Sequence, residues 1–185
     1  MSLNLTNQFL IAMPGMHDPN FQQTVTLVCA HNEDGAMGIV INRPMNIELG
    51  EVLDQMELKS QADAINRQPV YEGGPVHRDR GFIIHRADTE FDSTIHVSDA
   101  IAVSTSRDIL ASMSGGRGPD NTLVALGYAG WGAGQLESEM AANAWLSTPA
   151  EDAIIFNLPA AQRWQSAASR LGVDLTTISH DIGHA

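Results

Sequence analysis

The residues with the clearest chemical potential lie in a glycine-rich segment, residues 127–134, between a predicted strand and a predicted helix. Its GxGxG spacing differs from the GxGxxG of dinucleotide-binding segments. The start of a helix can hold an anion, but Glu137 and Glu139 follow near the first turn, where they repel a phosphate. The glycines therefore favour tight packing and unusual φ angles over ligand approach. Tyr128 and Trp131 within the segment can line a pocket or fill a core.

The helix that follows this segment carries a polar face. Gln135, Glu139 and Asn143 recur at every fourth residue, so a helix over residues 135–146 places two amides and a carboxylate on one side. This face is either the wall of a polar pocket or the solvated side of an amphipathic helix, and the second interpretation is favoured. Glu137 and Glu139 point in different directions on such a helix and make a poor acid–base pair.

Other common catalytic and metal sites find no support in the pattern. Lys59-Ser60 lacks the glycine run of a Walker A loop, and no GxSxG, SxxK or HExxH sequence occurs. The seven histidines are scattered over separate predicted elements, and the pair His180 and His184 lies in a C-terminal tail that we expect to be frayed. Cys29 lies in an apolar run, and we interpret it as a buried apolar residue. We expect neither a metal site nor a cofactor.

The net charge of the chain limits the kinds of partner that it can bind. The 185 residues include 22 acidic and 10 basic side chains, for a net charge of -12. Both the part up to residue 92 and the part after it are net negative. The one arginine cluster, residues 78–86, is interleaved with Asp79 and followed by Asp88, which favours surface salt bridges over an anion site. Because proteins grip nucleic acids by neutralising phosphates with Lys and Arg, we expect no direct nucleic-acid binding.

Length and apolar content predict one domain, residues 1–185, in the cytoplasm. A single cysteine cannot form an intramolecular disulfide, which fits a reducing compartment. The first basic residue is Arg43, so the start of the chain lacks the charged region of a signal peptide. No apolar run approaches the ~18 residues of a membrane helix, and we expect no membrane partner.

Hydrophobic periodicity and turn residues predict an α+β protein. Strands are expected at residues 8–13, 23–31, 37–42, 70–74, 81–86, 95–103 as two short strands or a bent one, 122–128 and 153–156. Helices are expected at residues 49–56, 107–113, 135–146 and 160–171. Asp34-Gly35 predicts a hairpin between the second and third strands, and Ser104-Thr105-Ser106 supplies hydroxyls to cap the second helix. Because several strands follow one another without a crossover helix, α+β is favoured over a doubly wound parallel sheet.

Three sets of residues together resemble the YqgE/AlgH family of bacterial proteins. They are Phe9 to Pro14 through Asp18-Pro19 to Ile41-Asn42-Arg43-Pro44; Gly73-Gly74-Pro75-Val76 with Gly81-Phe82 and His85; and Gly127 to Trp131 followed by Gly134-Gln135-Leu136-Glu137 and Glu139. They span most of the chain in the family's order. The resemblance implies a single α+β domain with a bifurcated, partly barrel-like sheet flanked by helices. It also implies the name transcriptional regulator, which some members carry because of a link to alginate production, but no catalytic residues, cofactor or substrate.

The resemblance supplies candidate ligand-binding residues without assigning a role to them. They are Asn42, Arg43, Gly73, Gly74, Pro75, Tyr128, Trp131, Gln135 and Glu139. Three hypotheses follow. The protein regulates transcription indirectly through protein or small-molecule contacts, or it is a ligand-binding module or an enzyme of unknown reaction, or the motifs are purely structural. We favour the first because of the family name and the acidic charge.

Overall fold

A computed structural model describes residues 3–175, which contain ten strands and six helices. The strands are β1 (Gln8–Ala12), β2 (Val25–Asn32), β3 (Gly35–Val40), β4 (Pro44–Glu48), β5 (Pro69–Glu72), β6 (Val76–Arg86), β7 (Thr94–His96), β8 (Ile101–Ser104), β9 (Thr122–Gly132) and β10 (Trp145–Pro149). The helices are α1 (Leu49–Gln55), α2 (Asp63–Asn66), α3 (Arg107–Ser114), α4 (Gln135–Ala141), α5 (Asp152–Phe156) and α6 (Ala160–Ser169). The α+β class is confirmed.

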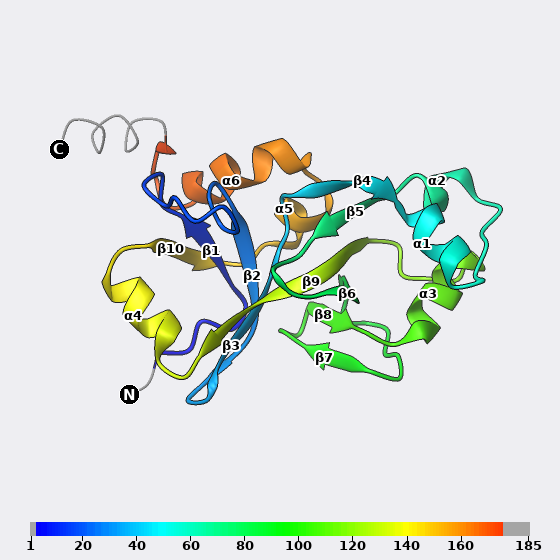
Figure 1. Cartoon of the computed structure of the whole chain (residues 1–185), viewed down its shortest axis with the longest axis horizontal. Coiled ribbons are helices and arrows are strands. Elements are labelled where there is room, and N and C mark those ends of the chain that lie inside the picture. Colours follow the sequence, from blue (N-terminus) through cyan, green and yellow to red (C-terminus); the bar gives the residue numbers. More distant parts are fainter. Residues whose placement is uncertain (1–2, 176–185) are drawn as a thin grey trace.

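The sheet is curled into a half-barrel that splits along one edge of β9 (Figure 1). Its main path runs β10-β1-β2-β3-β9-β6-β8-β7, with β4 and β5 as a branch. The end of β9, residues 129–132, pairs antiparallel with β3, whereas residues 124–126 pair parallel with β5. Strand β6 follows the opposite edge of β9. The sheet is therefore bifurcated, as the family resemblance implied.

Three glycines meet where β9 changes partner. Gly127 has a φ of +79°, and a Cβ built on it would lie 2.4 Å from the carbonyl oxygen of Gly74. A Cβ on Gly73 would lie 2.3 Å from the carbonyl oxygen of Gly127. The N–H of Gly73 donates to Leu126 O at 2.8 Å, and its carbonyl accepts from Val40 N at 2.8 Å. Backbone thus packs directly on backbone at the fork, and any side chain there would separate the two branches.

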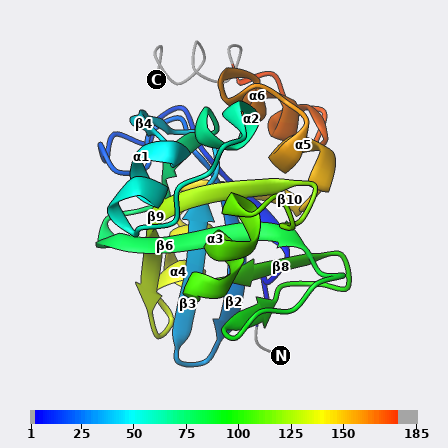
Figure 2. The same ribbon diagram turned by 90° about the vertical axis from the view of Figure 1, so that its right-hand side faces the viewer.

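Apolar side chains form three clusters around this fork. The central cluster joins β1, β2, β3, β6 and β9 to α5 and α6. A second lies between the β1–β2 and β9 strands and α4, and a third lies under α1 and α3 against β5, β6 and β9. Figures 1 and 2 show α1, α2 and α3 together at one end of the molecule. Helices therefore cover the sheet in separate groups, each over its own apolar cluster.

The prediction of a strand over residues 153–156 is wrong, because this segment is the helix α5. A short apolar run is compatible with either element, and here Asp152 lies in the first turn while Ile154 and Ile155 face the core. The helix predicted over residues 135–146 ends at Ala141. Asn143 then adopts a φ of +60°, and the chain continues as β10 beside β1. The polar face of that helix therefore does not extend to Asn143.

Other expectations are confirmed or refined. Strands β2 and β3 form the predicted hairpin, and β7 and β8 are the two short strands expected around residues 95–103. Strand β4 and the short α2 were not predicted. Ser106 is the N-cap of α3, but its hydroxyl donates to Asp108 instead of capping a helix N–H. No helix within residues 3–175 is long and apolar enough to cross a membrane. His180 and His184 lie outside the described residues.

Replacing Gly127 with Ala should destabilise the protein by about 3 kcal/mol or more, since the left-handed φ costs roughly 1–2 kcal/mol and the Cβ would also collide with backbone. Gly116 is a matched control because its φ is +77° and a Cβ there would meet nothing within 4 Å. Gly116→Ala should therefore cost only the conformational part. Urea unfolding of both variants measures the difference, and equal losses would show that the fork tolerates a side chain.

Candidate functional site

Arg43 holds the loop between β1 and β2. Its Nη1 donates to the carbonyl of Asn20 at 2.7 Å, and its Nη2 donates to that of Gln22 at 2.9 Å. Its own carbonyl accepts from the N–H of Glu72 at 2.8 Å, which ties the same residue to β5. The planar guanidinium suits this double donation. Arg43 therefore joins the loop over residues 13–24 to the branch of the sheet.

Asn42, the residue before Arg43, binds the same loop closer to the start of β2. Its Nδ2 donates to the carbonyl of Gln23 at 2.9 Å, and its Oδ1 accepts from the N–H of Val25 at 3.0 Å. Both polar atoms of this side chain are thus used within the protein. The two motif residues together fix the backbone of the loop where it enters β2.

An open depression of about 490 Å³ lies beside these two residues. Gln22 and Gln23 of the loop and Trp164 of α6 complete most of its wall. The indole N–H of Trp164 donates to Ala12 O at 3.0 Å, so its ring is held in place. The depression is polar and shallow. Its lining presents more amide groups than apolar surface to a ligand. Of the predicted site residues, only Asn42 and Arg43 line it.

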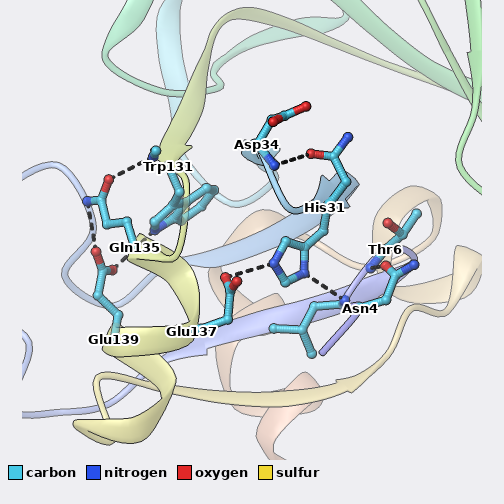
Figure 3. A network of polar contacts seen from close by, with 11 residues as sticks. Asn4, Thr6, His31, Asp34, Trp131, Gln135, Glu137 and Glu139 are labelled. Atoms are coloured by element: carbon cyan, nitrogen blue, oxygen red, sulfur yellow. Dashed lines mark hydrogen bonds and ion pairs between the residues drawn. The ribbon is translucent and has the colours of Figure 1, made fainter. Parts of the chain in front are cut away.

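A second group of predicted residues surrounds the carboxylate of Glu139. One of its oxygens accepts the indole N–H of Trp131 at 3.1 Å and that of Trp145 at 3.0 Å. Its other oxygen accepts from Nε2 of Gln135 at 2.9 Å. Gln135 in turn accepts the N–H of Gly132 at 2.9 Å. Glu139 thus links α4 to β9 and β10. Figure 3 shows Glu139 beside Gln135 and Trp131.

Phe21 links the two groups. Its ring stacks on Trp131 with centroids 6.1 Å apart and meets Trp145 edge-on at 5.5 Å. Phe21 belongs to the loop whose carbonyls Arg43 binds. The aromatic cluster and the Asn42–Arg43 pair are therefore joined through one short segment of chain, although neither lies next to the other in sequence.

The remaining predicted residues lie at the fork of the sheet. Gly73 and Gly74 are buried, and the atom nearest to a Cβ built on either glycine is a backbone atom. Pro75 follows them and is partly buried. Tyr128 packs edge-on against Phe82 at 5.4 Å and lies 5.9 Å from His77. These residues do not line the depression beside Arg43, so their ligand-binding role stays a prediction.

His31 and Glu137 form a contact that sequence reasoning missed. The N–H of Leu5 donates to Nδ1 of His31 at 3.0 Å, so the ring proton is on Nε2, which donates to Glu137 at 2.9 Å. This hydrogen bond lowers the pKa of Glu137 below its ordinary value. In Figure 3, Glu137 and Glu139 point to opposite sides of α4, as expected for a poor acid–base pair. The partners are 106 residues apart, and no local pattern signals their contact.

His85, Ser104 and Thr94 form a second unpredicted network across three strands. Nδ1 of His85 donates to Arg86 O at 2.7 Å, so Nε2 accepts from the Ser104 hydroxyl at 2.7 Å. Ser104 and Thr94 oxygens are 2.8 Å apart. A serine beside a histidine is also the pattern of an activated nucleophile. Both residues have no exposed surface, however, so in this structure the pair bridges strands.

The expectations about cysteine and arginine are resolved by specific contacts. Burial raises the pKa of Cys29 to about 12, which suppresses the reactive thiolate and agrees with an apolar role.

Within the arginine cluster, Arg86 pairs with Asp152 at 2.8 Å instead of Asp88, and Arg80 lies over the ring of Phe82. No group of three His, Cys, Asp or Glu side chains in residues 3–175 is arranged to hold a metal ion.

Three comparisons relate this chain to known proteins. The profile of a family described as AlgH-like matches residues 9–176. A UPF0301 protein of Thioalkalivibrio sulfidiphilus is 59% identical over 100% of this chain and 98% of its own length. A UPF0301 protein of Nitrosococcus oceani is 51% identical over 97% of this chain and 96% of its own. The chain therefore belongs to the AlgH-like family.

Solved structures agree with this assignment. The solution structure of the AlgH protein from Pseudomonas aeruginosa matches with a TM-score of 0.81 at 48% identity, covering 97% of this chain and 95% of that one. The crystal structure of a protein from Corynebacterium diphtheriae matches with a TM-score of 0.75 at 18% identity, covering 96% and 93%. The second likeness shows a shared fold alone.

Replacing Arg43 with Met should loosen the loop over residues 13–24, because two charge-assisted hydrogen bonds are lost, and should destabilise the protein by about 1–3 kcal/mol. Hydrogen exchange of the amides of residues 20–24 should accelerate relative to that of β6. Arg117→Met, at an exposed position in another loop, serves as the control. Unchanged exchange in the Arg43 variant would show that other contacts hold the loop.

Stability should decrease as the pH falls below 6.5, partly through His85. Burial, the largest cause, lowers the pKa of His85 below its ordinary value of 6.5. The unfolded chain therefore takes up this proton at a higher pH than the folded protein, and the stabilisation present above pH 6.5 is lost as the pH drops. His85→Gln should flatten this part of the profile, measured by urea unfolding at several pH values. A His85→Gln variant that keeps the wild-type slope would contradict the assignment.

Proposed function

We propose that this AlgH-like protein is a cytoplasmic regulatory protein that affects transcription indirectly, through contacts with another protein or a small molecule. In this proposal it does not bind DNA itself. The link to transcription comes from the family resemblance. The argument for an indirect role comes from how the chain uses its positive charges.

The internal use of arginine is the observation that carries the proposal. Arg43 donates to loop carbonyls, and Arg163 is 5% exposed and donates to the carbonyls of Leu158 and Ile41. Two further arginines are paired with carboxylates, Arg86 with Asp152 at 2.8 Å and Arg170 with Glu151 at 2.5 Å. Four of the ten basic side chains are thus committed to the fold. The other six are outnumbered by 22 acidic side chains, which opposes the neutralisation of phosphates.

The depression beside Arg43 is the contact surface that best fits this role. Hydrogen bonds hold its backbone in one shape, which reduces the ordering cost of binding. Gln22 and Gln23 are exposed at its wall, and Ala161 is exposed at its α6 side. Amide side chains at a preformed surface suit hydrogen bonding to a peptide or a polar small molecule. The regulatory contact is therefore assigned to this face of the molecule.

Replacing Ala161 with Arg tests this assignment, because a long side chain at that exposed position would obstruct the depression without entering the core. A strain lacking the protein should recover its transcript profile with the wild-type gene but not with Ala161→Arg. The matched control is Ala141→Arg, at an exposed position on α4, which should complement fully.

Both variants must first be shown to unfold at the wild-type urea midpoint, so that loss of complementation reports the surface and not the fold. Full complementation by Ala161→Arg would show that the depression is not the contact site. Failure of both variants to complement would show that the effect does not belong to this face.

A further inference from the structure

A small cavity of about 150 Å³ lies between the branch strand β5 and the helices α5 and α6 (Figure 1). It shares no lining residue with the depression beside Arg43. A protein cavity of about 150 Å³ can hold benzene, so this one has room for a molecule of a few carbon atoms. Its wall combines apolar with polar side chains, chiefly Leu123, Ile155 and Phe156 with Gln68, Tyr71 and Arg163.

Arg163 is a buried cation in this wall, with only 5% of its surface exposed. Its Nε donates to Leu158 O at 3.1 Å, and its Nη1 donates to Ile41 O. Its guanidinium carbon lies 5.1 Å from the centre of the Tyr71 ring, which also lines the cavity. Carbonyl oxygens and an aromatic face stabilise a cation without neutralising it. Because buried charges are normally paired with an opposite charge, Arg163 is suited to an anion.

The carboxylates near this cavity do not supply that anion. Within residues 3–175, Arg163 forms no ion pair with an Asp or Glu side chain, and none lines the cavity. Glu151 and Asp152 lie at the start of α5, but each is paired with another arginine, at 2.5 and 2.8 Å. Glu72 follows Tyr71 on β5, and the alternation of side chains along a strand turns it to the other face. The cavity therefore keeps the positive charge of Arg163.

Two donor groups in the lining have no hydrogen-bond partner in the described part of the chain. They are Nη2 of Arg163 and the hydroxyl of Tyr71, a residue that is 7% exposed. A buried tyrosine hydroxyl usually finds a partner. Neither atom is among the described side-chain atoms that are closed off from solvent without a partner, so both keep some accessible surface. The Thr122 hydroxyl donates to Oε1 of Gln68 at 3.2 Å, which leaves Nε2 of Gln68 as a third donor. These groups together suit an oxygen anion.

We propose that this cavity binds a small monocarboxylate, which accepts hydrogen bonds from Nη2 of Arg163 and from the Tyr71 hydroxyl. Its single negative charge matches the single cation of the lining, and a guanidinium group fits the planar carboxylate. Its short hydrocarbon part contacts Leu123 and Ile155. The inference does not rest on the regulatory contact proposed above, because the two sites have no lining residue in common.

Titration of methyl-labelled protein with propionate at constant ionic strength, followed by NMR, tests the site directly. The methyl signals of Leu123 and Ile155 should shift and saturate. Propionamide has nearly the same shape without the charge, and it should bind about tenfold more weakly because the charge-assisted hydrogen bonds are lost. Inorganic phosphate has no apolar part and carries more charge than one cation balances, so it should cause no saturable shift of these signals.

A conservative variant tests the role of the tyrosine hydroxyl. Tyr71→Phe keeps the ring over Arg163, so it should leave the urea unfolding midpoint close to that of the wild type. It should weaken propionate binding about tenfold, because a hydrogen bond to a charged group is lost. Tyr128→Phe removes the hydroxyl of the other tyrosine, at the fork of the sheet, and should leave propionate binding unchanged.

A second variant tests the cation. Arg163→Gln should lower the affinity for propionate to that for propionamide, since the positive charge is lost. Arg117→Gln removes an equal charge from an exposed loop and should have no effect.

Several results would overturn the proposal. They are equal affinity for propionate and propionamide, no saturable binding of propionate, saturable shifts confined to other methyl groups, phosphate binding with the same shifts, and unchanged propionate affinity in Tyr71→Phe. If Arg163→Gln does not fold, Tyr71→Phe and its Tyr128→Phe control still decide the question.

Discussion

Direct contact of backbone with backbone at the fork of β9 is the constraint on which the rest of the structure depends. Gly73 and Gly127 approach so closely that a Cβ on Gly73 would overlap the carbonyl oxygen of Gly127. This approach lets β9 pair with β3 at one end and with β5 at the other. The chain that leaves β3 can then reach β4 while Asn42 and Arg43 remain beside the loop that they bind. Loss of the close approach would therefore disturb the loop and the aromatic cluster that Phe21 joins to it.

The motif residues act mainly on one another, which explains why they occur together. Glu139 is saturated by two indole N–H groups and an amide, and the polar atoms of Asn42 are both bonded to backbone. What they present outward is a fixed surface and not a set of free reactive groups. The polar hollow beside Arg43 is part of that surface.

Local signals in the sequence predicted most of the strands, whereas contacts between distant segments escaped prediction. The Asp34-Gly35 turn and the helical spacing of Leu49 and Leu53 are local, and both predictions are confirmed. The short apolar run in residues 153–156 has no period that separates strand from helix, so α5 was missed. Strand β10 forms because β1 is beside it, which no window around Trp145 reveals. The contacts of His31 with Glu137 and of Asn42 with Val25 depend on the finished fold in the same way.

We propose that the protein influences transcription without binding DNA. Fluorescence anisotropy at physiological salt tests it most directly, with a labelled promoter duplex from a gene whose transcript changes when the protein is removed. We expect no saturable binding that distinguishes this duplex from one of scrambled sequence. Tight, sequence-dependent binding that weakens steeply as salt is raised would contradict an indirect role, because it would require a basic phosphate-binding face on the folded protein.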